Sequence, residues 1–134
     1  MMRSVKVKDY MATQLVTFRP ETNVVEAMRV FLDQKISGAP VVNEGGELVG
    51  ILSEVDLMQV VIQDSYYDES GGIVADYMKF PVDTIDPHQD IYTLALRFIE
   101  DGRRRFPVVD GGRLVGQVSR RDVLRAAEDF LLRR

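Results

Sequence analysis

The sequence predicts an α/β fold (α+β in some classifications): tandem β-α-β-β-α repeats packed about a pseudo-two-fold axis. The first observation is an internal repeat. The lead-in Asp9-Tyr10-Met11 recurs as Asp76-Tyr77-Met78, and Pro40-Val41-Val42 recurs as Pro107-Val108-Val109. The second observation is that apolar residues follow strand and helix periods in turn within each copy, with Gly-containing or Pro-containing turns between them. Two copies of one supersecondary unit therefore fill the chain.

Each element of the first copy has a local signal. A β-rich run stops at Arg19-Pro20, Thr22 or Asn23 can cap a helix, and the residues at 43–46 read as a glycine-bearing hairpin loop. The predicted elements, in order, are a lead-in at 5–11, a strand at 15–18, a helix from 22 or 23, strands at 40–42 and 47–52, and a helix from 53 to about 63.

The second copy repeats this order. We expect a strand near 82–85, a helix that begins near residue 91, strands at 107 and 114, and a last helix. The domain boundaries are then 1–63 for the first motif with its lead-in, 64–73 for the linker and 74–134 for the second motif, together one pair. Units of roughly 55 residues with one small sheet are marginal alone, so the halves should pack sheet to sheet and form two similar clefts.

Composition limits the classes of function. The 134 residues are 46% apolar and 28% charged, without an apolar run of about 18 residues, so we expect a soluble, cytoplasmic protein with no membrane partner. The absence of cysteine excludes disulfides and thiolate metal sites, and the net charge of -4 argues against a nucleic-acid partner. His88 is the one histidine and lies at a predicted helix entry, so we predict no metal site, no catalytic triad, no enzymatic activity and no obligatory cofactor.

One segment ends a strand and begins a helix in both copies. Gly50-Ile51-Leu52-Ser53-Glu54-Val55-Asp56 recurs as Gly116-Gln117-Val118-Ser119-Arg120-Arg121-Asp122. The Ser and Asp of each segment match a capping box, in which each side chain satisfies a backbone N–H of the first turn. The same geometry suits a nucleotide, because a helix start attracts phosphate and a carboxylate accepts from a ribose diol. Spacing alone does not separate the two interpretations.

With these motifs in the same order twice, the chain resembles a CBS-domain pair, also called a Bateman module. The resemblance implies a regulatory module that binds an adenosine-containing ligand, such as AMP, ADP, ATP or S-adenosylmethionine, in the clefts between its motifs. It implies disc-like homodimers and no catalytic residues. It places the ribose hydroxyls on Asp56 and Asp122, and it places Ser53 and Ser119 near ribose or phosphate.

Further site residues follow only from this resemblance. The residues before each Pro-Val-Val segment flank the base or the phosphate, and they are Ile36, Ser37, Gly38 and Ala39 in the first copy and Arg103, Arg104, Arg105 and Phe106 in the second. The first strand of the opposite motif completes the base pocket, which implicates Val82 for the Asp56 cleft and Leu15 for the Asp122 cleft. Phe106 is also open to a second interpretation, as a core residue.

The two copies differ in charge where a ligand would lie. Arginines at 103–105 and 120–121 replace mainly uncharged residues of the first copy, so we expect the Asp122 site to fill first, with ATP or ADP. A solvated arginine face or local pairing with Glu100 and Asp101 is the alternative. The sequence thus predicts a stand-alone ligand-sensing module, a homodimer whose state an unknown effector protein reads; a ligand-free dimerisation or scaffold module is the rival.

Overall fold

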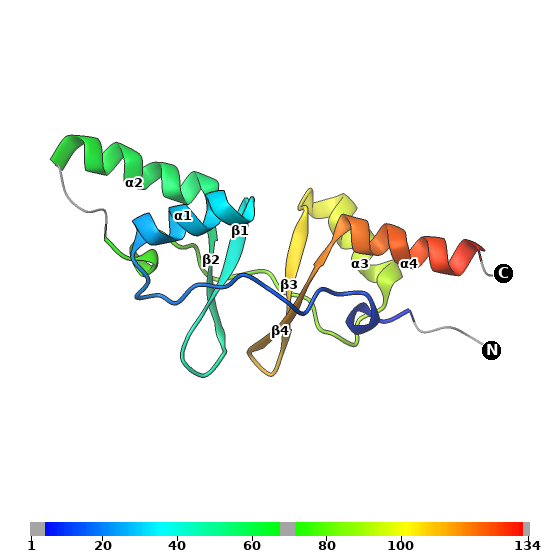
Figure 1. The fold of residues 1–134 in the computed structure, drawn as a ribbon. Coiled ribbons are helices and arrows are strands. Elements are labelled where there is room, and N and C mark those ends of the chain that lie inside the picture. Colours follow the sequence, from blue (N-terminus) through cyan, green and yellow to red (C-terminus); the bar gives the residue numbers. More distant parts are fainter. Residues whose placement is uncertain (1–4, 68–71, 133–134) are drawn as a thin grey trace. The chain divides into compact units, whose positions relative to one another are not determined.

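The computed structural model describes residues 5–67 and 72–132, and the chain divides into two compact units. The Asp56 unit comprises Val16–Val82, and the Asp122 unit comprises Met1–Leu15 together with Asp83–Arg134. Each lead-in therefore groups with the hairpin and helices of the other sequence copy. In both units two helices lie against one β-hairpin (Figure 1).

The Asp56 unit contains α1 (Val24–Gln34), β1 (Gly38–Val42), β2 (Leu48–Ser53), α2 (Glu54–Tyr67) and the short 3-10 helix η2 (Val74–Asp76). The side chain of Asn23 caps α1 by accepting hydrogen bonds from the N–H groups of Val25 and Glu26. The strands β1 and β2 are antiparallel, and their register places Gly38 opposite Ser53. This register brings the residues before Pro40 beside the start of α2.

The Asp122 unit contains η1 (Val7–Asp9), α3 (Ile91–Asp101), β3 (Arg105–Asp110), β4 (Arg113–Ser119) and α4 (Arg120–Leu132). Asp90 caps α3 by accepting from the N–H of Thr93, and Gly102 ends the helix in the left-handed conformation, with φ of 66°. The register of β3 and β4 places Arg105 opposite Ser119. The same arrangement thus recurs in both units.

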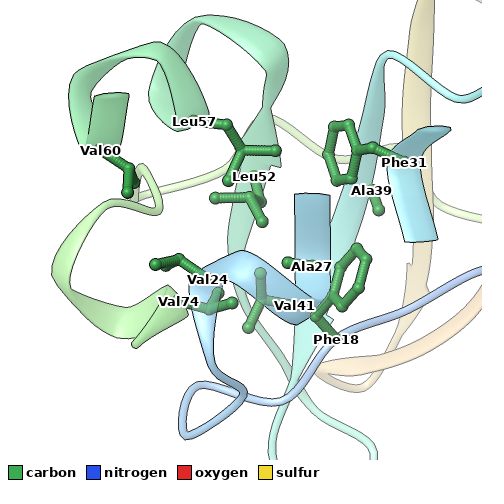
Figure 2. Packing of buried hydrophobic residues seen from close by; sticks show 10 residues of the cluster. All are labelled: Phe18, Val24, Ala27, Phe31, Ala39, Val41, Leu52, Leu57, Val60 and Val74. Atoms are coloured by element: carbon green, nitrogen blue, oxygen red, sulfur yellow. The ribbon is translucent and has the colours of Figure 1, made fainter. Parts of the chain in front are cut away.

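Each unit has its own apolar core. Figure 2 shows the core of the Asp56 unit, where side chains from α1, both strands, α2 and η2 meet; its members are Phe18, Val24, Ala27, Phe31, Ala39, Val41, Leu52, Leu57, Val60 and Val74. The core of the Asp122 unit comprises Val7, Ile85, Ile91, Leu94, Phe98, Phe106, Val108, Val118 and Ala126. The mixed α/β architecture that the sequence predicts is confirmed.

Two local predictions differ from the structure. The strands expected at 15–18 and 82–85 are reduced to single parallel bridges, Phe18 with Val41 and Ile85 with Val108. Proline follows two residues after each bridge and lacks the N–H that would extend the ladder. The helix α2 continues to Tyr67, beyond the predicted end near residue 63, because no glycine or proline interrupts that stretch.

Candidate functional site

The end of β2 and the start of α2 place Ser53 and Asp56 in direct contact. The N–H and the hydroxyl of Ser53 donate to Oδ2 of Asp56 over 2.8 and 2.9 Å, and the N–H of Asp56 donates to Oγ of Ser53 over 3.3 Å. Asp56 is only 2% exposed. This is the reciprocal pattern of a capping box.

The end of β4 and the start of α4 repeat this geometry. The N–H and the hydroxyl of Ser119 donate to Oδ2 of Asp122 over 2.8 and 3.1 Å, and the N–H of Asp122 donates to Oγ of Ser119 over 3.4 Å. Asp122 is 7% exposed. Both pairs are therefore helix caps, but the cap uses only one oxygen of each carboxylate. The second oxygen, Oδ1, remains available for another hydrogen-bond or ion-pair partner.

In both units a cation occupies this second oxygen, Oδ1. Lys79 forms an ion pair with Oδ1 of Asp56, and Arg125 forms one with Oδ1 of Asp122. Both cations are largely exposed, with 72% of the Lys79 side chain and 65% of the Arg125 side chain accessible to solvent. The charge of each buried carboxylate is thus balanced by the charge of a cation whose side chain is largely in contact with solvent.

The two cations come from different positions of the repeat. Lys79 follows the lead-in of the second copy, where the first copy has Ala12, whereas Arg125 lies on α4, where α2 has Gln59. Backbone bonds between Lys79 and Ile51, 2.9 and 3.0 Å long, hold the lead-in against β2 and so position Lys79 beside Asp56. Neither residue was predicted from the sequence, although a charge without a counterpart in the other copy was a signal that could have identified both.

The other residues predicted for the Asp56 site have different environments. The carbonyl of Ser37 accepts from the N–H of Glu54 over 3.1 Å, so Ser37 lies directly beside the helix start. Ala39 is buried in the core opposite Leu52. Ile36 is half-buried against the same core, and Val82 is half-buried at the end of this unit.

In the Asp122 unit, local contacts engage part of the predicted arginine cluster. Arg103 pairs with Asp83 over 2.7 Å, rather than with the acids at 100 and 101. The guanidinium of Arg120 donates to the carbonyls of Arg103 and Gly102, at 2.7 and 3.0 Å, which stabilises the C-terminus of α3. Arg104 is exposed, and its carbonyl accepts from the N–H of Arg120 over 3.2 Å.

Phe106 is a core residue of the Asp122 unit. It is completely buried, and its ring centroid lies 5.0 Å from that of Phe98. The guanidinium of Arg97 lies 4.8 Å from the ring centroid of Phe106, so one ring face is covered by a cation. The side chain of Phe106 therefore belongs to the apolar core. Leu15, the other residue predicted for this site, is half-buried in the same unit.

Comparison with known proteins identifies the family. The family model for the CBS domain matches residues 7–63 and 74–129. The chain belongs to the CBS-domain family. Among curated relatives, protein MK0525 of Methanopyrus kandleri is 33% identical over 133 residues, which are 98% of this chain and 66% of that protein. The chain spans 41% of the length of a relative from Methanocaldococcus jannaschii and 66% of the length of MK0525.

Solved structures of CBS-domain pairs have the same fold. The structure of CBSX2 from Arabidopsis thaliana in complex with AMP is 29% identical, with a TM-score of 0.82, and the match covers 96% of this chain and 99% of that one. The CBS-domain pair of protein MJ0100, in complex with 5-methylthioadenosine and S-adenosylmethionine, is 25% identical, with a TM-score of 0.74 over 93% of this chain and 97% of that one. In the parts of the chain that are described, no helix has the length and apolar character needed to span a bilayer.

Proposed function

We propose that the chain is a regulatory module that binds an adenosine-containing ligand at Ser53 and Asp56 and at Ser119 and Asp122. The carrying observation is a buried carboxylate at a helix start in each unit, with one oxygen outside the cap. A ribose diol donates two hydrogen bonds to such a carboxylate, and the first turn of the helix attracts phosphate. The solved complexes of CBSX2 with AMP and of MJ0100 with 5-methylthioadenosine and S-adenosylmethionine support an adenosine class of ligand.

Different residues surround the ligand at each of the two proposed sites. Ser37, which bonds to the helix start, Ile36 and Val82 would border the ligand of the Asp56 site, and Ala39 would do so through its backbone because its side chain is buried in the core. Arg103, Arg104, Phe106 and Leu15 would border the ligand of the Asp122 site, with Phe106 acting through its backbone because its ring is buried. The exposed Arg104 and Arg121 favour ligands with more phosphate charge, ADP or ATP, at the Asp122 site.

Ligand state is proposed to act through conformation or self-association, because each unit exposes an apolar helical face. Leu32 on α1 is 78% exposed, and Ile99 on α3 is 79% exposed. Each residue borders an apolar groove, between α1 and α2 in one unit and between α3 and α4 in the other. Exposed apolar patches of this kind mark interaction surfaces. We propose that a second copy of the chain covers them in a homodimer, whose state an effector protein reads.

A thermal-shift screen with AMP, ADP, ATP and S-adenosylmethionine tests the binding proposal. A ligand at a hundredfold excess over its dissociation constant adds about 2.7 kcal/mol to the free energy of unfolding. We expect a shift for the wild type that decreases in D56A and in D122A but persists in D110N, which changes an exposed carboxylate of β3. If no ligand shifts the folded wild type, the rival function, a ligand-free dimerisation or scaffold module, replaces the proposal.

A further inference from the structure

The two candidate ribose carboxylates are already occupied on both oxygens. A carboxylate has about four lone-pair positions. In the Asp56 unit Ser53 takes two of them on Oδ2, and Lys79 takes a third on Oδ1. In the Asp122 unit Ser119 and Arg125 do the same. One lone-pair position per carboxylate is therefore open, whereas a ribose diol that donates both hydroxyls needs two.

We propose that Lys79 and Arg125 are specificity-determining residues. Each cation competes with the ribose hydroxyls for the carboxylate, and once displaced it binds the phosphate of a nucleotide. This inference rests on the proposed function. The cation is the donor that leaves most easily, because it is exposed and water can solvate it, whereas the serine donors also cap the helix. When a neutral nucleoside binds, the whole free energy of the broken ion pair is lost. When a nucleotide binds, its phosphate recovers part of that free energy by pairing with the displaced cation.

The phosphate can regain this energy because the displaced cation stays close. The backbone bonds between Lys79 and Ile51 keep the base of the lysine side chain beside the site. Lysine and arginine both bind phosphate through charge-assisted hydrogen bonds. The preference for a nucleotide over its nucleoside therefore originates in the same residue that pairs with the candidate ribose carboxylate.

The two competitors differ in how firmly they are held. Arg125 also donates to the carbonyl of Tyr10 over 3.3 Å, and so connects α4 to the lead-in. Lys79 reaches Asp56 from outside the helix, through a flexible side chain that is 72% exposed. The Asp56 site consequently exchanges its cation for a ribose more readily than the Asp122 site.

The repeat itself provides matched variants. K79A introduces the residue that the other copy has at this position, Ala12, and R125Q introduces the counterpart Gln59. K8A and R113Q remove the same charge from exposed positions in η1 and β4 and serve as controls. Binding of adenosine and of AMP is measured by titration calorimetry on the full chain, with D122N isolating the Asp56 site and D56N isolating the Asp122 site.

We expect K79A to bind adenosine about 1.5- to fivefold more tightly at the Asp56 site, the range for the loss of an exposed ion pair. AMP should gain less or weaken, so that the ratio of AMP affinity to adenosine affinity falls. R125Q should behave likewise at the Asp122 site, and R125K, which keeps the charge, should retain the wild-type ratio. In the wild type, raising the salt concentration from about 0.05 to 0.5 M should strengthen adenosine binding, because salt screens the competitor.

The outcomes separate this inference from the proposed function. If the isolated sites bind adenosine and AMP but K79A and R125Q match K8A and R113Q in both affinities, the competitor proposal is overturned and the binding function stands. Weaker adenosine binding in K79A, with an unchanged circular dichroism spectrum, would also overturn it. If the wild type binds neither adenosine nor AMP, the competitor proposal is overturned. The proposed function falls with it only if ADP, ATP and S-adenosylmethionine also leave the thermal unfolding of the wild type unchanged.

Discussion

The glycine of each repeated motif lies where a lead-in crosses the hairpin, and we predict that G116A destabilises the chain more than G50A. A Cβ atom on Gly116 would lie 2.9 Å from the carbonyl oxygen of Ala12 and 2.5 Å from Sδ of Met11. A Cβ atom on Gly50 would lie 3.2 Å from the carbonyl oxygen of Lys79 and 2.6 Å from Sδ of Met78. The thioether of a methionine can move away, whereas the carbonyl belongs to a backbone pair.

The magnitude follows from what has to move. At Gly116 the lead-in must retreat, which weakens two backbone hydrogen bonds between Ala12 and Gln117, 2.8 and 2.9 Å long. Each such bond contributes about 1 kcal/mol net, and overpacking adds about 1–3 kcal/mol. We therefore expect G116A to lower the free energy of unfolding by about 2–4 kcal/mol. At Gly50 the carbonyl contact is merely tight, and we expect about 1–2 kcal/mol.

Equilibrium unfolding in urea measures both free energies. The double variant M11A/G116A removes the sulfur contact but keeps the carbonyl contact, so it should remain less stable than M11A alone. A G116A variant within about 0.5 kcal/mol of the wild type, or one more stable than G50A, would refute the reasoning, since surface substitutions without such a clash fall in that range.

Three further predictions concern the caps and the exposed helical face. D56N and D122N should each lower the free energy of unfolding by about 0.5–2 kcal/mol in urea titrations, as lost caps do. The backbone N–H and the hydroxyl of Thr93 lower the pKa of Asp90 from its ordinary value of 3.8, so the stabilisation from Asp90 is present above that pH and is lost as the pH falls below it. D90N should therefore lose less stability than the wild type upon acidification, measured by chemical unfolding at a series of pH values. I99E should reduce self-association in sedimentation velocity, because it places a charge on the exposed face of α3.

A specific experimental result would contradict each of these three predictions. Wild-type stability of D56N and D122N would mean that the carboxylate charge adds nothing measurable to the two helix caps. Parallel acid unfolding of D90N and the wild type would mean that another carboxylate governs the transition. An I99E variant that sediments like the wild type would contradict the proposed self-association through this face. K8Q, which also makes the net charge more negative by one, is the control.

The repeat made most of the fold predictable. Hairpin, helix and cap follow from residues that recur at matched positions, and the reciprocal bonds of Ser53 with Asp56 have the geometry that the spacing predicts. The first strands were less predictable. Phe18 pairs through a single bridge, because the length of a strand depends on its packing and pairing with the neighbouring strand, which the local sequence does not specify. The sequence predicted that this strand stops at Arg19-Pro20, but it did not predict that the pairing is limited to one bridge.

Side-chain environments were less predictable than the fold. Arginine runs allow both solvated and paired interpretations, and only the structure shows that Arg120 bonds to the end of α3 and Arg103 to Asp83. The partners of Asp56 and Asp122 also depend on tertiary geometry, because Lys79 approaches Asp56 through the pairing of the lead-in with β2. Sequence spacing contains no information about such a partner unless the two copies are compared position by position.

Calorimetric titration of AMP into the wild type and into the double variant D56N/D122N tests the central claim most directly. Circular dichroism establishes that the double variant is folded, and D110N controls for the loss of a carboxylate charge. The proposed function predicts that AMP binds the wild type and D110N, and that the double variant binds it at least about tenfold more weakly, since charge-assisted hydrogen bonds contribute about 1.5–3 kcal/mol each. A folded double variant that binds AMP with the wild-type affinity would contradict the assignment of the ligand to these two carboxylates.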